Sequence, residues 1–155
     1  MLVDFNTISD ESRLWIYGSE SKLTDYQQKI ILNKISEYLK TWDYHNNSLT
    51  SAVRIKENHF IVIALDDFEF GVGGCSIDSL QRIIQELERD FNISLLNRLN
   101  VFCKIENKIH CVPLHKLGTV AKPDTLFYDI TIQRKYELKT YIKPIKDGWC
   151  VENLL

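Results

Sequence analysis

The chain has 155 residues, of which 45% are hydrophobic and 26% are charged, and its formal net charge is −2. This balance is typical of a folded globular protein and argues against a disordered chain. A chain of this length holds one ordinary domain, so we expect residues 1–155 to form a single domain. The near-neutral charge offers no general attraction for nucleic acid. The longest apolar run, residues 60–65, is too short to cross a membrane.

The first residues of the chain bear on where the protein resides. Residues 1–5 lack the basic start and the apolar run of a secretory signal peptide. We therefore expect a cytoplasmic protein whose four cysteines remain reduced.

The first half of the chain predicts a strand, a helix and two further strands. A short strand is expected at residues 14–17. Thr24 and Gln27 have the spacing of a capping box, and apolar residues then recur at helical spacing, which predicts a helix over 25–41. Alternation at residues 53–56 predicts a half-buried strand, and the apolar run 60–65 predicts a central strand that is buried on both faces.

The second half predicts another helix and further strands. Ser76 is the expected N-cap of this helix and Asp78 is expected in its first turn, while the apolar spacing ends near Asn92. Strands are expected at 101–105, 109–112 and 126–132, and residues 134–155 give no clear pattern.

The order strand, helix, strand, strand, helix, strand is that of the ferredoxin-like fold. We therefore expect an α+β protein, in which two helices pack on one face of an antiparallel sheet and extra strands follow at the C-terminal end. The segment after Pro113 could cover the opposite face of that sheet. In that case the face would be closed to any partner.

The segment 66–79 combines glycines with the beginning of a helix. Glycines allow a close approach of the backbone, and the free N–H groups of a helix N-terminus favour an anion. The sequence therefore suggests a site for a small anionic ligand, or for an acidic group of a partner, at Gly71, Gly73, Gly74, Cys75, Ser76 and Asp78.

The same segment has other interpretations. The helix dipole could stabilise a Cys75 thiolate and make it a nucleophile, although nearby carboxylates would oppose this. Asp66, Asp67 and Glu69 could instead hold a divalent cation, although acidic loops are mostly just solvated. The glycines could also simply turn the chain, with Cys75 as a small buried residue. We expect neither a metal nor a cofactor.

Several parts of the chain resemble a family of small bacterial proteins that is often labelled "ABC transporter ATPase". They are the apolar strand that ends in Asp-Asp, and the runs 14–17, 73–78 and 85–88, together with Trp149. The resemblance spans most of the chain and implies no catalytic residues. The ATPase label fails on the residues, because the chain has no GxxxxGK[ST] run and no lysine between Lys56 and Lys104.

The sequence as a whole favours a non-enzymatic binding or interaction domain. A thiol-dependent enzyme that uses Cys75 is the first alternative. A subunit that forms a homo-oligomer through an exposed sheet face or edge is the second. Basic and aromatic residues alternate in 134–149, but the segment also carries acidic residues, so we expect it to dock on the sheet rather than to bind nucleic acid.

Overall fold

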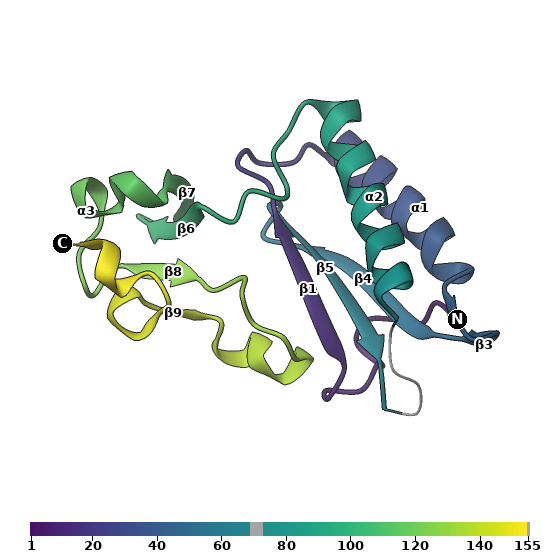
Figure 1. Ribbon diagram of the computed structural model, residues 1–155. Coiled ribbons are helices and arrows are strands. Elements are labelled where there is room, and N and C mark those ends of the chain that lie inside the picture. Colours follow the sequence, from purple (N-terminus) through teal and green to yellow (C-terminus); the bar gives the residue numbers. More distant parts are fainter. Residues whose placement is uncertain (69–72, 155) are drawn as a thin grey trace.

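The computed structural model describes residues 1–68 and 73–154, apart from the side chain of Cys75. Helices and antiparallel sheets combine in it, which confirms the α+β class (Figure 1). The first sheet has the strand order β1–β5–β4, and two helices lie side by side on one of its faces. These elements are β1 (Arg13–Gly18), α1 (Asp25–Lys40), β4 (Thr50–Lys56), β5 (Phe60–Asp66) and α2 (Gly74–Phe91).

Alternation of side chains gives the first sheet two buried faces. Residues of one parity, such as Trp15 and Ile63, pack with α1 and α2. Residues of the other parity, such as Ile16 and Val62, pack with the C-terminal half of the chain. The central strand β5 is buried on both faces up to Leu65, as the apolar run 60–65 predicted.

The capping and turn signals in the sequence are confirmed where they are local. The Thr24 hydroxyl accepts a hydrogen bond from the Gln27 N–H at 3.1 Å, and the Gln27 side chain accepts one from the Thr24 N–H at 3.0 Å. This is the predicted capping box at the start of α1. Helix α2 ends where Asn92 takes a left-handed conformation, with φ 50°. The β4–β5 hairpin turns on two residues of positive φ, Glu57 and Asn58.

The C-terminal half forms a second sheet with the order β7–β6–β8–β9. One of its faces packs on the first sheet through Phe102, Tyr128 and Tyr141, so the face opposite the helices is covered. The other face carries a small core of its own, closed by the short C-terminal helices. The elements of this half are β6 (Asn100–Ile105), β7 (Lys108–Pro113), α3 (Leu117–Val120), β8 (Leu126–Tyr128), β9 (Ile142–Pro144) and the 3-10 helices Leu114–Lys116, Lys135–Thr140, Ile145–Asp147 and Val151–Leu154.

The expectation of one ferredoxin-like sheet is not confirmed, because β6 lies in the second sheet. In a ferredoxin-like sheet the fourth strand would lie beside the first. Here β6 is buried on both faces at Val101, Phe102 and Cys103, and it has strand partners on both sides in β7 and β8. It is therefore the central strand of a separate sheet, and β1 stays at the edge of the first sheet.

Smaller corrections concern two predicted elements. The strand expected over 126–132 ends at Tyr128, because Asp129 accepts hydrogen bonds from the backbone and hydroxyl of Thr131 and turns the chain there. A two-stranded hairpin of β2 (Asp43–Tyr44) and β3 (Asn47–Ser48) follows α1 and was not predicted. Across the described part of the chain, no helix is both long and apolar enough to span a membrane.

Candidate functional site

The predicted glycine-rich site lies at the beginning of α2, and it is only partly described. Gly73 is the N-cap of the helix, and the ring of Tyr44 packs directly against it. A β-carbon added at Gly74 would meet no other described part of the chain within 4 Å, apart from its neighbours and its own helix. Gly71 lies outside the described residues, and so does the side chain of Cys75. The anion site and the Cys75 nucleophile therefore stay predictions.

Two roles assigned within this segment are wrong. Ser76 is not the N-cap, because α2 begins two residues earlier, and its hydroxyl donates instead to the Asp43 carbonyl oxygen at 3.1 Å. The Ser76 carbonyl accepts hydrogen bonds from the side chains of Tyr38 and Trp42. Asp78 is exposed and lies beyond the first turn, where a carboxylate gains little from the helix dipole.

The acidic residues after β5 have partners in the fold. The Asp67 carboxylate accepts hydrogen bonds from Arg134 at 2.9 and 3.1 Å, and Asp66 accepts one from the Phe68 N–H. Glu69, the third residue of the suggested cation site, lies outside the described residues. Within residues 1–68 and 73–154, no three His, Cys, Asp or Glu side chains gather as metal ligands would.

The three cysteines with described side chains are poor nucleophiles. Burial raises the pKa of Cys103 and of Cys111 to about 11, and burial also raises the pKa of Cys150. A catalytic thiol needs the opposite shift, toward the thiolate at neutral pH. The thiol-enzyme alternative therefore depends on Cys75 alone.

A groove of about 390 Å³ runs beside the outer edge of β1. Its floor is the strand from Arg13 to Tyr17. One wall comes from α2 and the segment after it, and the other from residues 130–133 and the half-exposed ring of Trp149. Its size is within the range of about 300–1,000 Å³ that is usual for ligand pockets. We refer to this feature as the β1 groove.

The groove exists because a neighbouring segment pairs with only the first part of β1. The Leu14 N–H donates to the Gln133 carbonyl at 2.9 Å, and the Lys135 N–H donates to the Ser12 carbonyl at 3.0 Å. Before Gln133 the segment turns away from β1, because Ile132 is buried between the two sheets. The β1 groove lies in this fork.

Backbone groups of β1 point into the fork. Antiparallel pairing with β5 uses the N–H and C=O groups of Trp15 and Tyr17. The N–H and C=O groups of Ile16, which lies between them, therefore point away from β5. No described residue makes a hydrogen bond with the outward groups of Ile16 or with the Gly18 N–H. Gly18 is also the point where the second sheet touches β1, since the Phe102 ring occupies the space of a Gly18 side chain.

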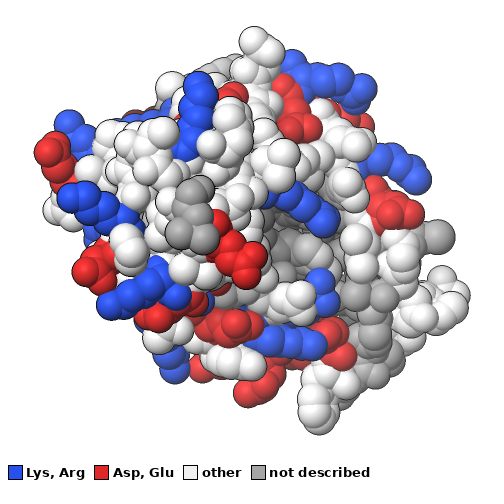
Figure 2. Space-filling model, turned by 60° about the vertical axis from the view of Figure 1, so that its left-hand side comes forward, with Lys and Arg blue, Asp and Glu red and all other residues white. Residues whose placement is uncertain are grey.

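The charges in the groove are all positive. Arg13 and Arg98 line it, and no described lining residue is acidic. The Arg13 guanidinium lies 5.1 Å from the centre of the Trp15 ring, and its Nε is buried with no hydrogen-bond partner among the described residues. Elsewhere positive and negative side chains are interspersed, as on the face shown in Figure 2. The groove therefore differs from that surface, because its charged side chains are all positive and lie beside aromatic rings.

Tyr17 lines the groove close to the positive charge of Arg98. Burial raises the pKa of Tyr17 to about 12, and the nearby positive charge of Arg98 acts in the opposite direction. The Tyr17 hydroxyl is therefore neutral at physiological pH, and the cation beside it stays available for an anionic ligand.

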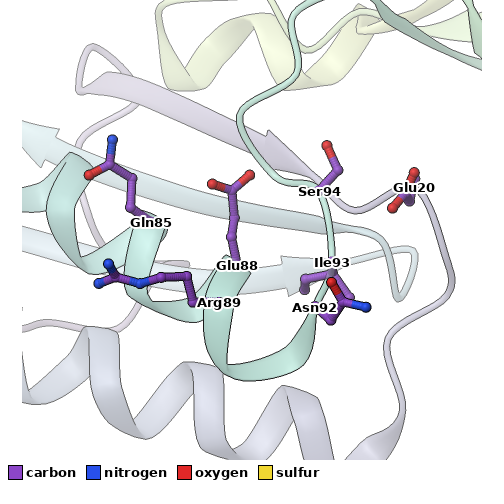
Figure 3. A pocket seen from close by; sticks show the side chains of 7 residues that line it. All are labelled: Glu20, Gln85, Glu88, Arg89, Asn92, Ile93 and Ser94. Atoms are coloured by element: carbon purple, nitrogen blue, oxygen red, sulfur yellow. The ribbon is translucent and has the colours of Figure 1, made fainter.

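A second hollow, of about 550 Å³, lies at the C-terminal end of α2 (Figure 3). It is shallow and open to solvent, and Glu20, Glu88 and Arg89 are among its lining residues. The Glu88 carboxylate accepts hydrogen bonds from the N–H groups of Leu95 and Leu96 at 2.8 and 3.0 Å. This carboxylate holds the chain after α2 in place, so the hollow has a structural explanation that the β1 groove lacks.

Sequence reasoning missed the β1 groove. Its lining comes from five separate segments; the strand at 14–17 and the second helix were predicted as elements, but their meeting in one groove was not. One signal was present in the sequence. Three consecutive apolar residues at 101–103 are typical of a strand buried on both faces, which does not suit the edge of a ferredoxin-like sheet.

Comparisons of the chain with models of protein families, with curated proteins and with solved structures found no match.

Proposed function

We propose that this protein is a binding domain that holds an anionic, partly apolar ligand in the β1 groove. The observation that carries the proposal is the pair Arg13 and Arg98, which line an aromatic groove and have no ion-pair partner among the described residues. A guanidinium in a partly enclosed site binds a carboxylate or a similar anion more strongly than it would in water. The aromatic side chains supply the apolar contact area.

The fold supports this choice of site. The order and pairing of β1, β4 and β5 beneath two helices support our interpretation of this half as a ferredoxin-like unit that lacks its fourth strand. The β1 groove then lies at the position that the missing strand would fill. We further propose a cytoplasmic setting in a bacterial cell, as the resemblance in the sequence implies.

The proposal is tested with the fluorescent probe anilinonaphthalene sulfonate, which combines a negative charge with aromatic rings. We expect one saturable site on the native protein. The double variant Arg13→Gln, Arg98→Gln should weaken probe binding by about tenfold or more, because it removes both cations.

Arg89→Gln is the matched control, since Arg89 is an exposed arginine that lines the shallow hollow at the end of α2. It should leave the affinity unchanged. Near-ultraviolet circular dichroism would verify that each variant keeps its native packing. The absence of saturable binding, or equal affinity in the double variant and the wild type, would contradict the proposal.

A further inference from the structure

We infer that the ligand of the β1 groove is an extended peptide segment with acidic side chains, which adds to the first sheet as a strand beside β1. The inference rests on the proposed function and names the chemical class of its ligand. A sheet edge with free N–H and C=O groups is a template for an added strand, and this mode of peptide recognition recurs in many proteins.

The backbone of β1 supplies the pairing. The outward N–H and C=O of Ile16, which lines the groove, have no hydrogen-bond partner among the residues that the structure describes. They lie next to the point where Gln133 already pairs with Leu14. An added segment would therefore continue the ladder that the chain itself has begun.

The side chains supply the preference for an acidic segment. Successive residues of a strand point to opposite faces, so an added strand presents alternate side chains to the two sides of the groove. On the side of the helices it meets Trp15 and Tyr17, with Arg13 over the Trp15 ring and Arg98 near Tyr17. On the other side it meets the apolar residues around Ile16. An alternation of acidic and apolar residues matches both.

A second copy of this protein fits the groove less well than a single strand. In a dimer that pairs β1 with β1, each β1 would have to enter the fork of the other copy. Each strand is itself flanked by the walls of its own groove, which come from residues 95–100 and 130–133. These walls would collide before the two edges met, whereas an isolated peptide strand carries no such walls.

The test uses the peptide acetyl-Val-Glu-Val-Glu-Val-amide and the full-length protein. Its sequence reads the same in both directions, so it does not presuppose parallel or antiparallel pairing. With saturating peptide, we expect amide hydrogen exchange at Ile16 to slow by at least about tenfold. Exchange at Val53, on the opposite edge strand β4, should not change.

Two analogues separate strand addition from other binding modes. The same peptide with N-methyl groups on its three central residues should bind about tenfold more weakly, because methylation removes the backbone donors on both edges of the added strand, whether it runs parallel or antiparallel to β1. The lysine analogue acetyl-Val-Lys-Val-Lys-Val-amide should not bind the wild type. The variant Arg98→Glu should lower the affinity for the glutamate peptide by about threefold to tenfold and raise the affinity for the lysine peptide. The control variant Arg89→Glu should change neither affinity.

The outcomes are distinguishable from those of the probe experiment. If the glutamate peptide fails to bind at millimolar concentration, or if it binds without protecting Ile16, strand addition is wrong. Equal affinity of the methylated analogue would also overturn it. Saturable, arginine-dependent binding of anilinonaphthalene sulfonate in the same preparation would then leave the proposed function standing with a different ligand class.

Discussion

The two edge strands of the first sheet, β1 and β4, differ in what lies beside their outward backbone groups. Along β4, the N–H and C=O of Ser51 are bonded to Met1 and Val3. Further along, Arg54 and Lys56 place charged side chains on this edge strand, where they lie against aromatic rings. Charged residues and short covering segments are common protections of a sheet edge against unwanted pairing.

Along β1 the protection stops halfway. Residues 133–135 cover its beginning, and the strand then continues from Trp15 to Gly18 with no charged residue. This part of the edge has no charged side chain of its own to prevent strand pairing. It lies in a groove that is lined by Arg13 and Arg98. The described segments therefore cover the β4 edge more fully than the β1 edge, and the uncovered part of β1 is where we propose that an acidic strand binds.

The largest effect is expected where β1 is held against the second sheet. Gly18→Ala would place a methyl group in the space of the Phe102 ring. We expect a loss of about 1–3 kcal/mol in the free energy of unfolding, as for other overpacked core positions. Urea denaturation followed by circular dichroism would measure it.

The matched control for Gly18→Ala is Gly74→Ala, since no described heavy atom outside its chain neighbours and its own helix backbone lies within 4 Å of the methyl group added at Gly74. Glycine destabilises a helix relative to alanine, so this variant should leave the free energy of unfolding unchanged or raise it by up to about 1 kcal/mol. Equal changes in the two variants would show that β1 is not packed against β6 in the way described.

A smaller effect is expected from the titration of Tyr17 in the groove wall. An unfolded chain ionises tyrosine near pH 10, whereas burial raises the pKa of Tyr17 to about 12 in the folded protein. Between these values the unfolded state binds fewer protons than the folded state, so the free energy of unfolding decreases as the pH rises. Tyr17→Phe should reduce this decrease when the two proteins are compared below pH 10 and at pH 12. The same pH dependence in both would contradict the burial of the Tyr17 hydroxyl.

Local patterns in the sequence were sufficient for most elements. The capping box at Thr24, the helical spacing in α1 and α2, and the apolar run of β5 all depend on neighbouring residues, and all were confirmed. The N-cap at Ser76 was wrong because that hydroxyl has a more distant partner, the Asp43 carbonyl. Hydrogen bonds between distant segments leave no spacing that a reader of the sequence can use.

The candidate site could not be predicted for a related reason. Periodicity indicates that β6 is a strand, but it does not indicate which strand lies beside it. The pairing of β6 with β7 and β8 leaves the edge of β1 open, and the divergence of the chain before Gln133 makes the fork. Both features are consequences of tertiary packing, so Arg13 and Arg98 had no visible connection in the sequence.

Amide hydrogen exchange in the free protein distinguishes an open β1 edge from a covered one. The N–H groups of Trp15 and Tyr17 point toward β5, and that of Ile16 points into the groove. Nuclear magnetic resonance should show exchange at Ile16 that is at least about a hundredfold faster than at its two neighbours, because only the neighbours are protected by the ladder. Equal protection of all three amides would mean that another segment already occupies the edge, and the binding site proposed here would be closed.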